Sequence, residues 1–353
     1  METKTIGIIG VVVVVVAVLL GITFMGGESE LAPEETTSPQ EEQQAEESKK
    51  GGKIASGWEI TTIKEGLPYV VDPLGVAIDA EDNLHLVYPD PDESDITHTY
   101  QENGEWKNEV IAELGPGDVG SALPDVVIQE GALHVAFQGA EGLVYAQKEN
   151  GEWSTEIVDQ KGEGSGGLSL GVGDSPHILY RRQGDLLSDN PFHTAYASKV
   201  NGEWQTEKLD VPRVASLVVD ENNIPHLSYK EEDNIYHGVL EGDQWNFEVV
   251  EEGVSDAEAG KVLLSEGAPK FIYSEKVEFK DFLREATLQN DTWQVEEIDT
   301  KELSGYGFSS ELDKEGQLGT SYGFFKDGIQ DDEFGWHELV YAQKKNGQLK
   351  QII

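Results

Sequence analysis

Cysteine is absent from the 353 residues, so the chain has no disulfide framework, no thiolate metal site and no cysteine nucleophile. Basic residues are scarce, because 25 lysines and arginines stand against 68 acidic residues and give a formal net charge of −43. So acidic a surface repels phosphate backbones, which excludes nucleic acid as a partner. The acidity is spread along the whole chain, which favours general solvation in a saline medium over specific cation binding.

Long apolar runs are also missing, with one exception near the N-terminus. Residues 6–25 carry no charge, and 20 residues at about 1.5 Å per residue are long enough to cross a bilayer core. We interpret residues 1–26 as a transmembrane helix that acts as an uncleaved signal anchor; a cleaved signal peptide is the alternative. Lys4 precedes the run and an acidic segment follows it, which predicts a single-pass cell-membrane protein with its C-terminal domain extracellular.

A second segment lacks large apolar residues almost completely. Residues 27–53 are rich in Glu, Gln, Ser, Thr, Pro and Gly, and they cannot bury enough surface to offset the entropy of ordering. This composition predicts a disordered acidic linker between the membrane anchor and a domain over residues 54–353.

That domain contains a repeat and shows no helical periodicity. A polar turn followed by an apolar residue and an alternating strand recurs at Trp58, Trp106, Trp153, Trp204, Trp245, Trp293 and Leu349. Several of these turns are Asn-Gly, the strongest short-range signal for a β-hairpin. Further strands lie at 85–88, 134–137, 177–180, 226–229, 270–273 and 319–322. Four short strands in each period predict an all-β fold, a six-bladed β-propeller. Because Trp58 is a surplus outer strand, seven blades are the alternative.

The repeat is most complete over residues 219–229, which combine Val-Asp, a turn and Pro-His-Leu-Ser-Tyr ahead of the next Trp turn. It resembles the repeats of secreted or surface propellers of the sialidase-like, BNR-repeat group, and the resemblance covers about residues 54–353. The resemblance implies the propeller fold. The Asp-box of true sialidase blades, Ser-x-Asp-x-Gly-x-x-Trp, is not present in that form. The four arginines are also scattered, whereas a sialidase site gathers three, so no catalytic residue is carried over.

Candidate ligand contacts lie on the more irregular face of the predicted propeller. Strands that alternate in direction place the loops after the second strands and between blades on one face, and binding residues concentrate on such variable loops. Arg181 and Arg182 are the predicted contacts for an anionic ligand, since they are adjacent cations in so acidic a chain. Trp336 and His337 are the predicted aromatic platform for a sugar or peptide, with simple loop packing as the alternative.

Metal ligands are suggested by closely spaced acidic residues. Asp90, Asp92 and Asp95 offer closely spaced hard oxygens suited to Ca²⁺, which is the one candidate cofactor. Solvated charge is the alternative, because the glycine and the distal glutamate of an EF-hand are missing. A histidine begins four of the second strands, at His85, His134, His177 and His226. Its recurrence once per blade predicts a buried structural position with one hydrogen bond.

No nucleophile motif, phosphate-binding loop or zinc spacing occurs, which favours a protein without catalysis. The sequence therefore predicts a membrane-anchored extracellular recognition module that binds a glycan or a surface protein. A glycan-cleaving hydrolase or lyase on the same scaffold is the first alternative, and a structural envelope component is the second. Fold alone does not choose among them, because function resides in a site.

Overall fold

The structure, a computed structural model, describes residues 75–352 except for 82, 91–93, 103–104, 115–122, 164–166, 186–190, 213, 255–257, 266, 278–279, 291, 304–307, 313–317, 326–336 and 346–347. The chain divides into two units, Met1–Val70 and Val71–Ile353, and all described residues belong to the second. The predicted transmembrane helix, the linker and Trp58 lie outside them. Within the described residues, no helix has the length and hydrophobicity needed to cross a bilayer.

The described residues are all-β and form six antiparallel sheets in which consecutive strands pair. The first sheet contains β1 (Gly75–Ile78), β2 (Leu84–Asp90), β3 (Asp95–Glu102) and β4 (Glu105–Glu113). The second contains β5 (Asp125–Gln129), β6 (Ala132–Gly139), β7 (Gly142–Glu149) and β8 (Glu152–Asp159). The third contains β10 (Ser169–Val172), β11 (Pro176–Gln183), β12 (Phe192–Val200) and β13 (Glu203–Lys208), and a short fifth strand, β9 (Gly162–Glu163), also pairs with β11.

The remaining sheets repeat the plan. The fourth contains β14 (Val214–Val219), β15 (Pro225–Glu231), β16 (Asn234–Glu241) and β17 (Gln244–Glu252). The fifth contains β18 (Glu258–Ser265), β19 (Ala268–Val277), β20 (Lys280–Gln289) and β21 (Thr292–Leu303). The sixth contains β22 (Phe308–Leu312), β23 (Leu318–Phe325), β24 (His337–Lys345) and β25 (Gln348–Ile352). The four-strand period predicted from the sequence is confirmed in each of these sheets.

The Asn-Gly turns have the backbone that a tight hairpin needs. Asn150 and Gly151 have φ of 52° and 85°, and Asn201 and Gly202 have φ of 52° and 84°. Positive φ at both central positions is the mark of a type I′ turn, whose twist matches that of the flanking strands. These two residue types therefore fix the pairing of β7 with β8 and of β12 with β13.

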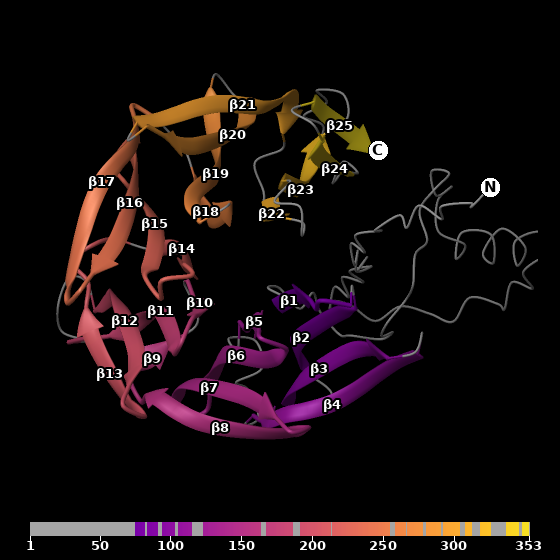
Figure 1. Cartoon of the computed structure of the whole chain (residues 1–353), viewed down its shortest axis with the longest axis vertical. Coiled ribbons are helices and arrows are strands. Elements are labelled where there is room, and N and C mark those ends of the chain that lie inside the picture. The colour runs from indigo at the N-terminus through magenta and orange to yellow at the C-terminus, as the bar shows by residue number, and fades with distance from the viewer. Residues whose placement is uncertain are drawn as a thin grey trace, which may run out of the picture. The chain divides into compact units, whose positions relative to one another are not determined.

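Apolar residues of neighbouring sheets pack together. The first strands of successive sheets contact one another in the order β1, β5, β10, β14, β18 and β22. In Figure 1 the sheets follow one another in chain order, and fourth strands such as β8 and β17 lie outermost. Val87 of the first sheet packs in one cluster with Val135 and Phe137 of the second. These three side chains are at most 1% exposed, and burying each stabilises the fold by about 1.5–3 kcal/mol.

In the third and fourth sheets the repeated tryptophan contacts the preceding sheet, the packing role expected from its recurrence. The Trp204 ring lies edge-on to Tyr145 of the preceding sheet, and its indole N–H donates to Glu156 over 2.9 Å. Trp245 lies in the same way against Tyr196 and donates to Glu207 over 3.0 Å. The glutamate stands three positions after the preceding tryptophan, so a Trp-x-x-Glu pattern carries both halves of the contact.

Candidate ligand-binding pocket

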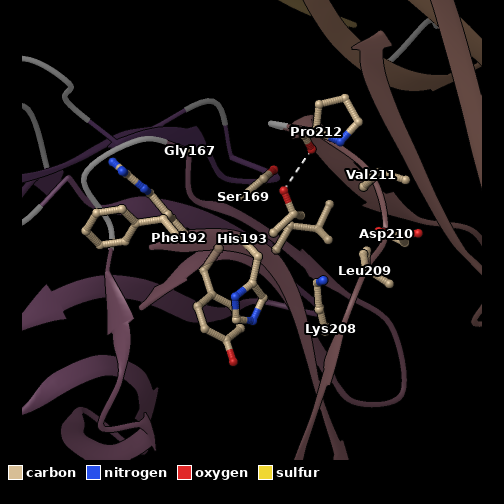
Figure 2. Close-up of a pocket in the computed structure, with 13 residues that line it drawn as sticks. Gly167, Ser169, Phe192, His193, Lys208, Leu209, Asp210, Val211 and Pro212 are labelled. Atoms are coloured by element: carbon tan, nitrogen blue, oxygen red, sulfur yellow. Dashed lines mark hydrogen bonds between the residues drawn. The ribbon is translucent and has the colours of Figure 1, made fainter. Parts of the chain in front are cut away.

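A pocket of about 410 Å³ opens at one end of the third sheet. Its walls come from the start of β10, the end of β11, the start of β12, the end of β13 and the segment 209–212 that leads to the fourth sheet. The pocket thus includes residues beside a loop after a second strand and a link between sheets, which are the connections that the sequence predicted to share one face. Figure 2 shows the residues around it.

The segment 209–212 is held in place by the third strand. The Leu209 N–H donates to the Thr194 carbonyl oxygen over 3.0 Å, and the Thr194 hydroxyl donates to the Pro212 carbonyl oxygen over 2.7 Å. The second bond is the dashed line in Figure 2. Leu209 is buried, so an apolar anchor and two hydrogen bonds keep this wall of the pocket next to β12.

Arg181 lines the pocket with its guanidinium over an aromatic ring. Its Cζ atom lies 3.7 Å from the centre of the Phe192 ring, which is within the range of a cation–π contact. The antiparallel register pairs Gln183 with Phe192 and Arg181 with Thr194, so the two strands bring this cation and this ring to the same end of the sheet. Of the predicted contacts, Arg181 is the one that lines the pocket.

His193 and Lys208 add basic groups to the same wall. Burial lowers the pKa of the His193 imidazole, and the positive charges of Lys208 and Arg182 lower it further. Lys208 is exposed, and within the described part of the chain no acidic group forms an ion pair with it. Asp210 is the one carboxylate among the residues that line the pocket. Three basic side chains, Arg181, His193 and Lys208, therefore line a pocket that has one acidic group.

Arg182 has a different role from its neighbour. Its Nε donates to Asp159 Oδ2 over 2.5 Å, and the Tyr180 hydroxyl donates to the same oxygen over 2.8 Å. Burial raises the pKa of Asp159, but the hydrogen bonds that it accepts, chiefly from Arg182, outweigh burial and hold its pKa below the usual value. The predicted contact Arg182 thus joins the third sheet to the second. It does not line the pocket, but its positive charge lowers the pKa of His193, which does.

The predicted aspartate cluster differs from an open loop. Asp90 ends β2 and Asp95 begins β3, where they pair directly across the hairpin, and both are buried. The Thr97 hydroxyl donates to Asp95 Oδ1 over 2.7 Å. The strands therefore extend into the stretch that the sequence left as a loop. Asp92 lies outside the described residues, and no group of three metal-ligating side chains occurs among the described residues. Calcium binding at these aspartates stays a prediction.

The predicted aromatic platform of Trp336 and His337 lies only partly within the described residues. Trp336 lies outside the described residues, and His337 is the first residue of β24, paired with Phe325. His337 belongs to the sixth sheet, whereas Arg181 and Arg182 belong to the third, so these predicted contacts come from two different sheets.

Two basic residues of the pocket, Lys208 and His193, were missed by sequence reasoning, and one left a signal. The position of Lys208, four residues after Trp204, is filled by Val110, Ile157 and Val249 in three other sheets and by Glu297 in the fifth. A lysine in place of an exposed aliphatic residue is a departure from the repeat. His193 left no comparable signal, because its place in the pocket depends on where residues 209–212 fold.

No protein-family model matches this chain, and no curated protein matches it. Solved structures do. A protein of unknown function from Dyadobacter fermentans has a TM-score of 0.51 at 13% identity, over 76% of this chain and 93% of that one. Virginiamycin B lyase from Staphylococcus aureus has a TM-score of 0.50 at 9% identity, over 79% of this chain and 83% of that one. A puromycin-hydrolyzing peptidase from Mycobacterium tuberculosis has a TM-score of 0.52 at 10% identity, over 79% of this chain and 53% of that one. At these identities the likeness shows only a propeller-like all-β fold.

Proposed function

We propose that this protein is a cell-surface recognition module that binds a negatively charged glycan in the pocket of the third sheet. The observation that carries the proposal is a local reversal of charge. The chain as a whole has a net charge of −43, yet the cations Arg181 and Lys208 line one pocket that contains a single carboxylate, Asp210. A carboxylate or sulfate group bound there would complete the ionic contacts that the pocket offers.

The size and lining of the pocket suit a sugar. Its volume falls in the range of roughly 300–1,000 Å³ that is typical of small-molecule sites. Phe192 supplies apolar ring surface, and Asp210 and Ser169 supply side-chain oxygens for hydrogen bonds. Apolar surface combined with a few directed polar groups is the usual lining of such a site. A protein ligand with an acidic side chain would use the same contacts, and the test below separates the two.

The pocket gives less support to glycan cleavage. Hydrolysis by the common route uses two carboxylates about 5–10 Å apart, whereas Asp210 is the one acidic residue in the lining. Tyr180 is a poor base for a lyase, because burial raises the pKa of its hydroxyl and the hydroxyl donates to Asp159. Cleavage would be seen as release of new chain ends from a polymeric substrate, and we expect none.

The finer fold and the location are part of the same proposal. Six sheets whose first strands follow one another from β1 to β22 support a closed six-bladed propeller over residues 54–353, similar to the sialidase-like group. The uncharged run at 6–25 supports an anchor that leaves this domain outside the cell, tethered by residues 27–53. Calcium at Asp90, Asp92 and Asp95 is proposed as a structural ion without a role in the pocket.

The test is a binding measurement on the full chain in detergent. An oligogalacturonate is compared with its methyl ester, which has the same sugars and no charge, and with an acidic peptide. We expect Lys208→Gln to weaken oligogalacturonate binding about tenfold, since a charge-assisted hydrogen bond contributes about 1.5–3 kcal/mol. Lys107→Gln, which removes one charge from the first sheet, is the matched control and leaves binding unchanged. Equal binding of the acid and the ester would refute an ionic contact. Tighter binding of the acidic peptide than of the oligogalacturonate would show that the ligand is a protein and not a glycan.

A further inference from the structure

Two of the described sheets contain the same chain of ionisable side chains, built around two buried histidines. In the first sheet, His85 Nδ1 lies 2.9 Å from His98 Nε2, and His98 Nδ1 lies 2.6 Å from Glu109 Oε1. At the other end, His85 Nε2 lies 3.4 Å from Asp79 Oδ2. All four side chains come from successive elements of one sheet: the β1–β2 turn, β2, β3 and β4.

The fourth sheet repeats this chain with the same atoms. His226 Nδ1 lies 2.9 Å from His237 Nε2, His237 Nδ1 lies 2.9 Å from Glu248 Oε1, and His226 Nε2 lies 3.8 Å from Asp220 Oδ2. The paired imidazoles are parallel within 8° in the first sheet and within 1° in the fourth. The four histidines are at most 8% exposed.

The second and third sheets provide internal references, because a tyrosine replaces the second histidine. His134 Nδ1 lies 2.5 Å from the Tyr145 hydroxyl, and His177 Nδ1 lies 2.5 Å from the Tyr196 hydroxyl. On its other side, His177 Nε2 faces the neutral Ser175 hydroxyl at 3.4 Å. The strand scaffold is therefore the same in all four sheets, and so is the glutamate on the fourth strand, because Glu156 and Glu207 hold the positions of Glu109 and Glu248. The contact between the first histidine and an aspartate is found in two of the four.

Counting protons shows what the two chains lack. Glu109 and Glu248, as carboxylates, only accept, so His98 and His237 each donate from Nδ1. Their Nε2 atoms then accept from His85 and His226. Two neutral imidazoles supply two protons, which are used in the two short contacts. Nothing is left for the third contact, where the bare Nε2 of the first histidine faces the oxygen of Asp79 or Asp220. The geometry of the fourth sheet agrees with this count, because His226 Nε2 is buried and has no hydrogen-bond partner, with Asp220 Oδ2 3.8 Å away.

We propose that the Asp220–His226–His237–Glu248 chain is a proton-binding site, completed by one proton taken up between Asp220 Oδ2 and His226 Nε2; the Asp79–His85–His98–Glu109 chain repeats its arrangement. A proton at that Nε2 forms a charge-assisted bond to the aspartate and gives all three contacts a donor and an acceptor. This proposal is independent of the glycan pocket, which contains none of the eight residues.

Groups on the neighbouring sheet surround the glutamate end of each chain. Among the described residues, the first chain faces one external charge, Lys148 of β7, whose Nζ donates to Glu109 Oε1 over 2.5 Å. From the fifth sheet, two uncharged rings, Phe271 and Trp293, lie edge-on to His237 of the fourth-sheet chain. The Trp293 indole N–H donates to Glu248 Oε1 over 3.3 Å. Each chain thus ends on the oxygen that also holds the next sheet, so proton uptake acts on the contacts between sheets.

The fourth-sheet chain is the clearer one to test. Burial and the neighbouring His237 lower the pKa of His226, while Asp220 raises it; burial lowers the pKa of His177, which faces no such carboxylate, to about 4. An opposite charge within about 4–6 Å favours the protonated imidazole by roughly one to three pKa units. We therefore expect the proton affinity of His226 to exceed that of His177 by about tenfold or more.

The experiment is NMR of the full chain in detergent with ¹⁵N-labelled histidine, assigned by single His→Gln variants. At pH 8 we expect His226 and His237 in the Nδ1–H tautomer. On acidification we expect His226 to become protonated at a higher pH than His177. Asp220→Asn should abolish this difference, because the asparagine amide N–H can donate to the neutral Nε2, so no additional proton needs to be bound. Asp174→Asn in the corresponding turn of the third sheet is the control and changes neither histidine. An Nε2–H tautomer at pH 8, titration of His226 together with His177, or no effect of Asp220→Asn would each overturn the proposal.

Discussion

The third and fifth sheets use one scaffold and place different charges on it. In both, a buried tyrosine of the second strand donates its hydroxyl to an acidic residue of the preceding sheet: Tyr180 to Asp159 and Tyr273 to Glu251. The next position is Arg181 in the third sheet and Ser274 in the fifth. Two positions after the tyrosine, Arg182 pairs with Asp159, whereas Glu275 pairs with Arg284 of its own sheet. The comparison teaches that the repeat supplies the frame, and that departures from the repeat supply the site.

The shared frame is tested first, where the largest effect is expected. Tyr180 and Tyr273 are at most 1% exposed, so Tyr180→Ala and Tyr273→Ala each leave a large cavity. We expect each to lower the free energy of unfolding by about 3–5 kcal/mol, measured by urea denaturation. A cost below 1 kcal/mol in one sheet alone would show that the two tyrosines are not structurally equivalent.

The two acidic partners sharpen the comparison through pH. Asp159 has a lowered pKa, so its contribution to stability is present above the unfolded value of about 3.9 and is lost as pH falls through the folded pKa. Asp159→Asn should cost about 1.5–3 kcal/mol at pH 7 and progressively less below pH 4, measured by urea denaturation across this range.

Glu251 should behave in the opposite way. Burial raises its pKa, and the charge of Glu275 raises it further against the effect of Arg284. The stability that its protonated form contributes is present below the unfolded value of about 4.3 and is lost as pH rises through the folded pKa. Glu251→Gln should therefore stabilise the protein at pH 7 and have little effect at pH 3. The same sign of effect for Asp159→Asn and Glu251→Gln at pH 7 would contradict this contrast.

The smallest effect on the fold comes from making the third sheet resemble the fifth at one position. Arg181→Ser introduces the residue found at position 274, and it should weaken oligogalacturonate binding about tenfold in calorimetry, because a cation is lost from the pocket. Stability should change by less than about 1 kcal/mol, since Arg181 is a half-buried residue at the end of a strand. Unchanged affinity would move the binding site away from this pocket.

Sequence reasoning reached the frame better than the site. The Asn-Gly turns and the His and Trp series predicted where strands begin and pair, because these features recur in each period and depend on local backbone preferences. Arg181 was found because a pair of arginines is conspicuous in an acidic chain. His193 was missed, since its position in the pocket depends on how residues 209–212 fold back on Thr194. Asp90 and Asp95 were placed in a loop, although the strands run through both.

The partner histidines were also beyond a pattern search. His85 and His226 were correctly predicted to be buried, but each was expected to make one hydrogen bond. The residue on the third strand that pairs two positions after the first histidine is histidine in two sheets and tyrosine in two others, and this distinction acquires meaning only when the register is known. Long-range pairing, therefore, limited what the sequence could predict more than local structure did.

The most direct test of the binding pocket is the pKa of His193 followed by NMR during titration with oligogalacturonate. The positive charges of Lys208 and Arg182 lower this pKa in the free protein, so a bound carboxylate that offsets them should raise it. We predict a rise that saturates with the acidic glycan and is absent with its methyl ester. An unchanged pKa at saturating acidic glycan, or an equal rise with the ester, would contradict an anionic site at this end of the third sheet.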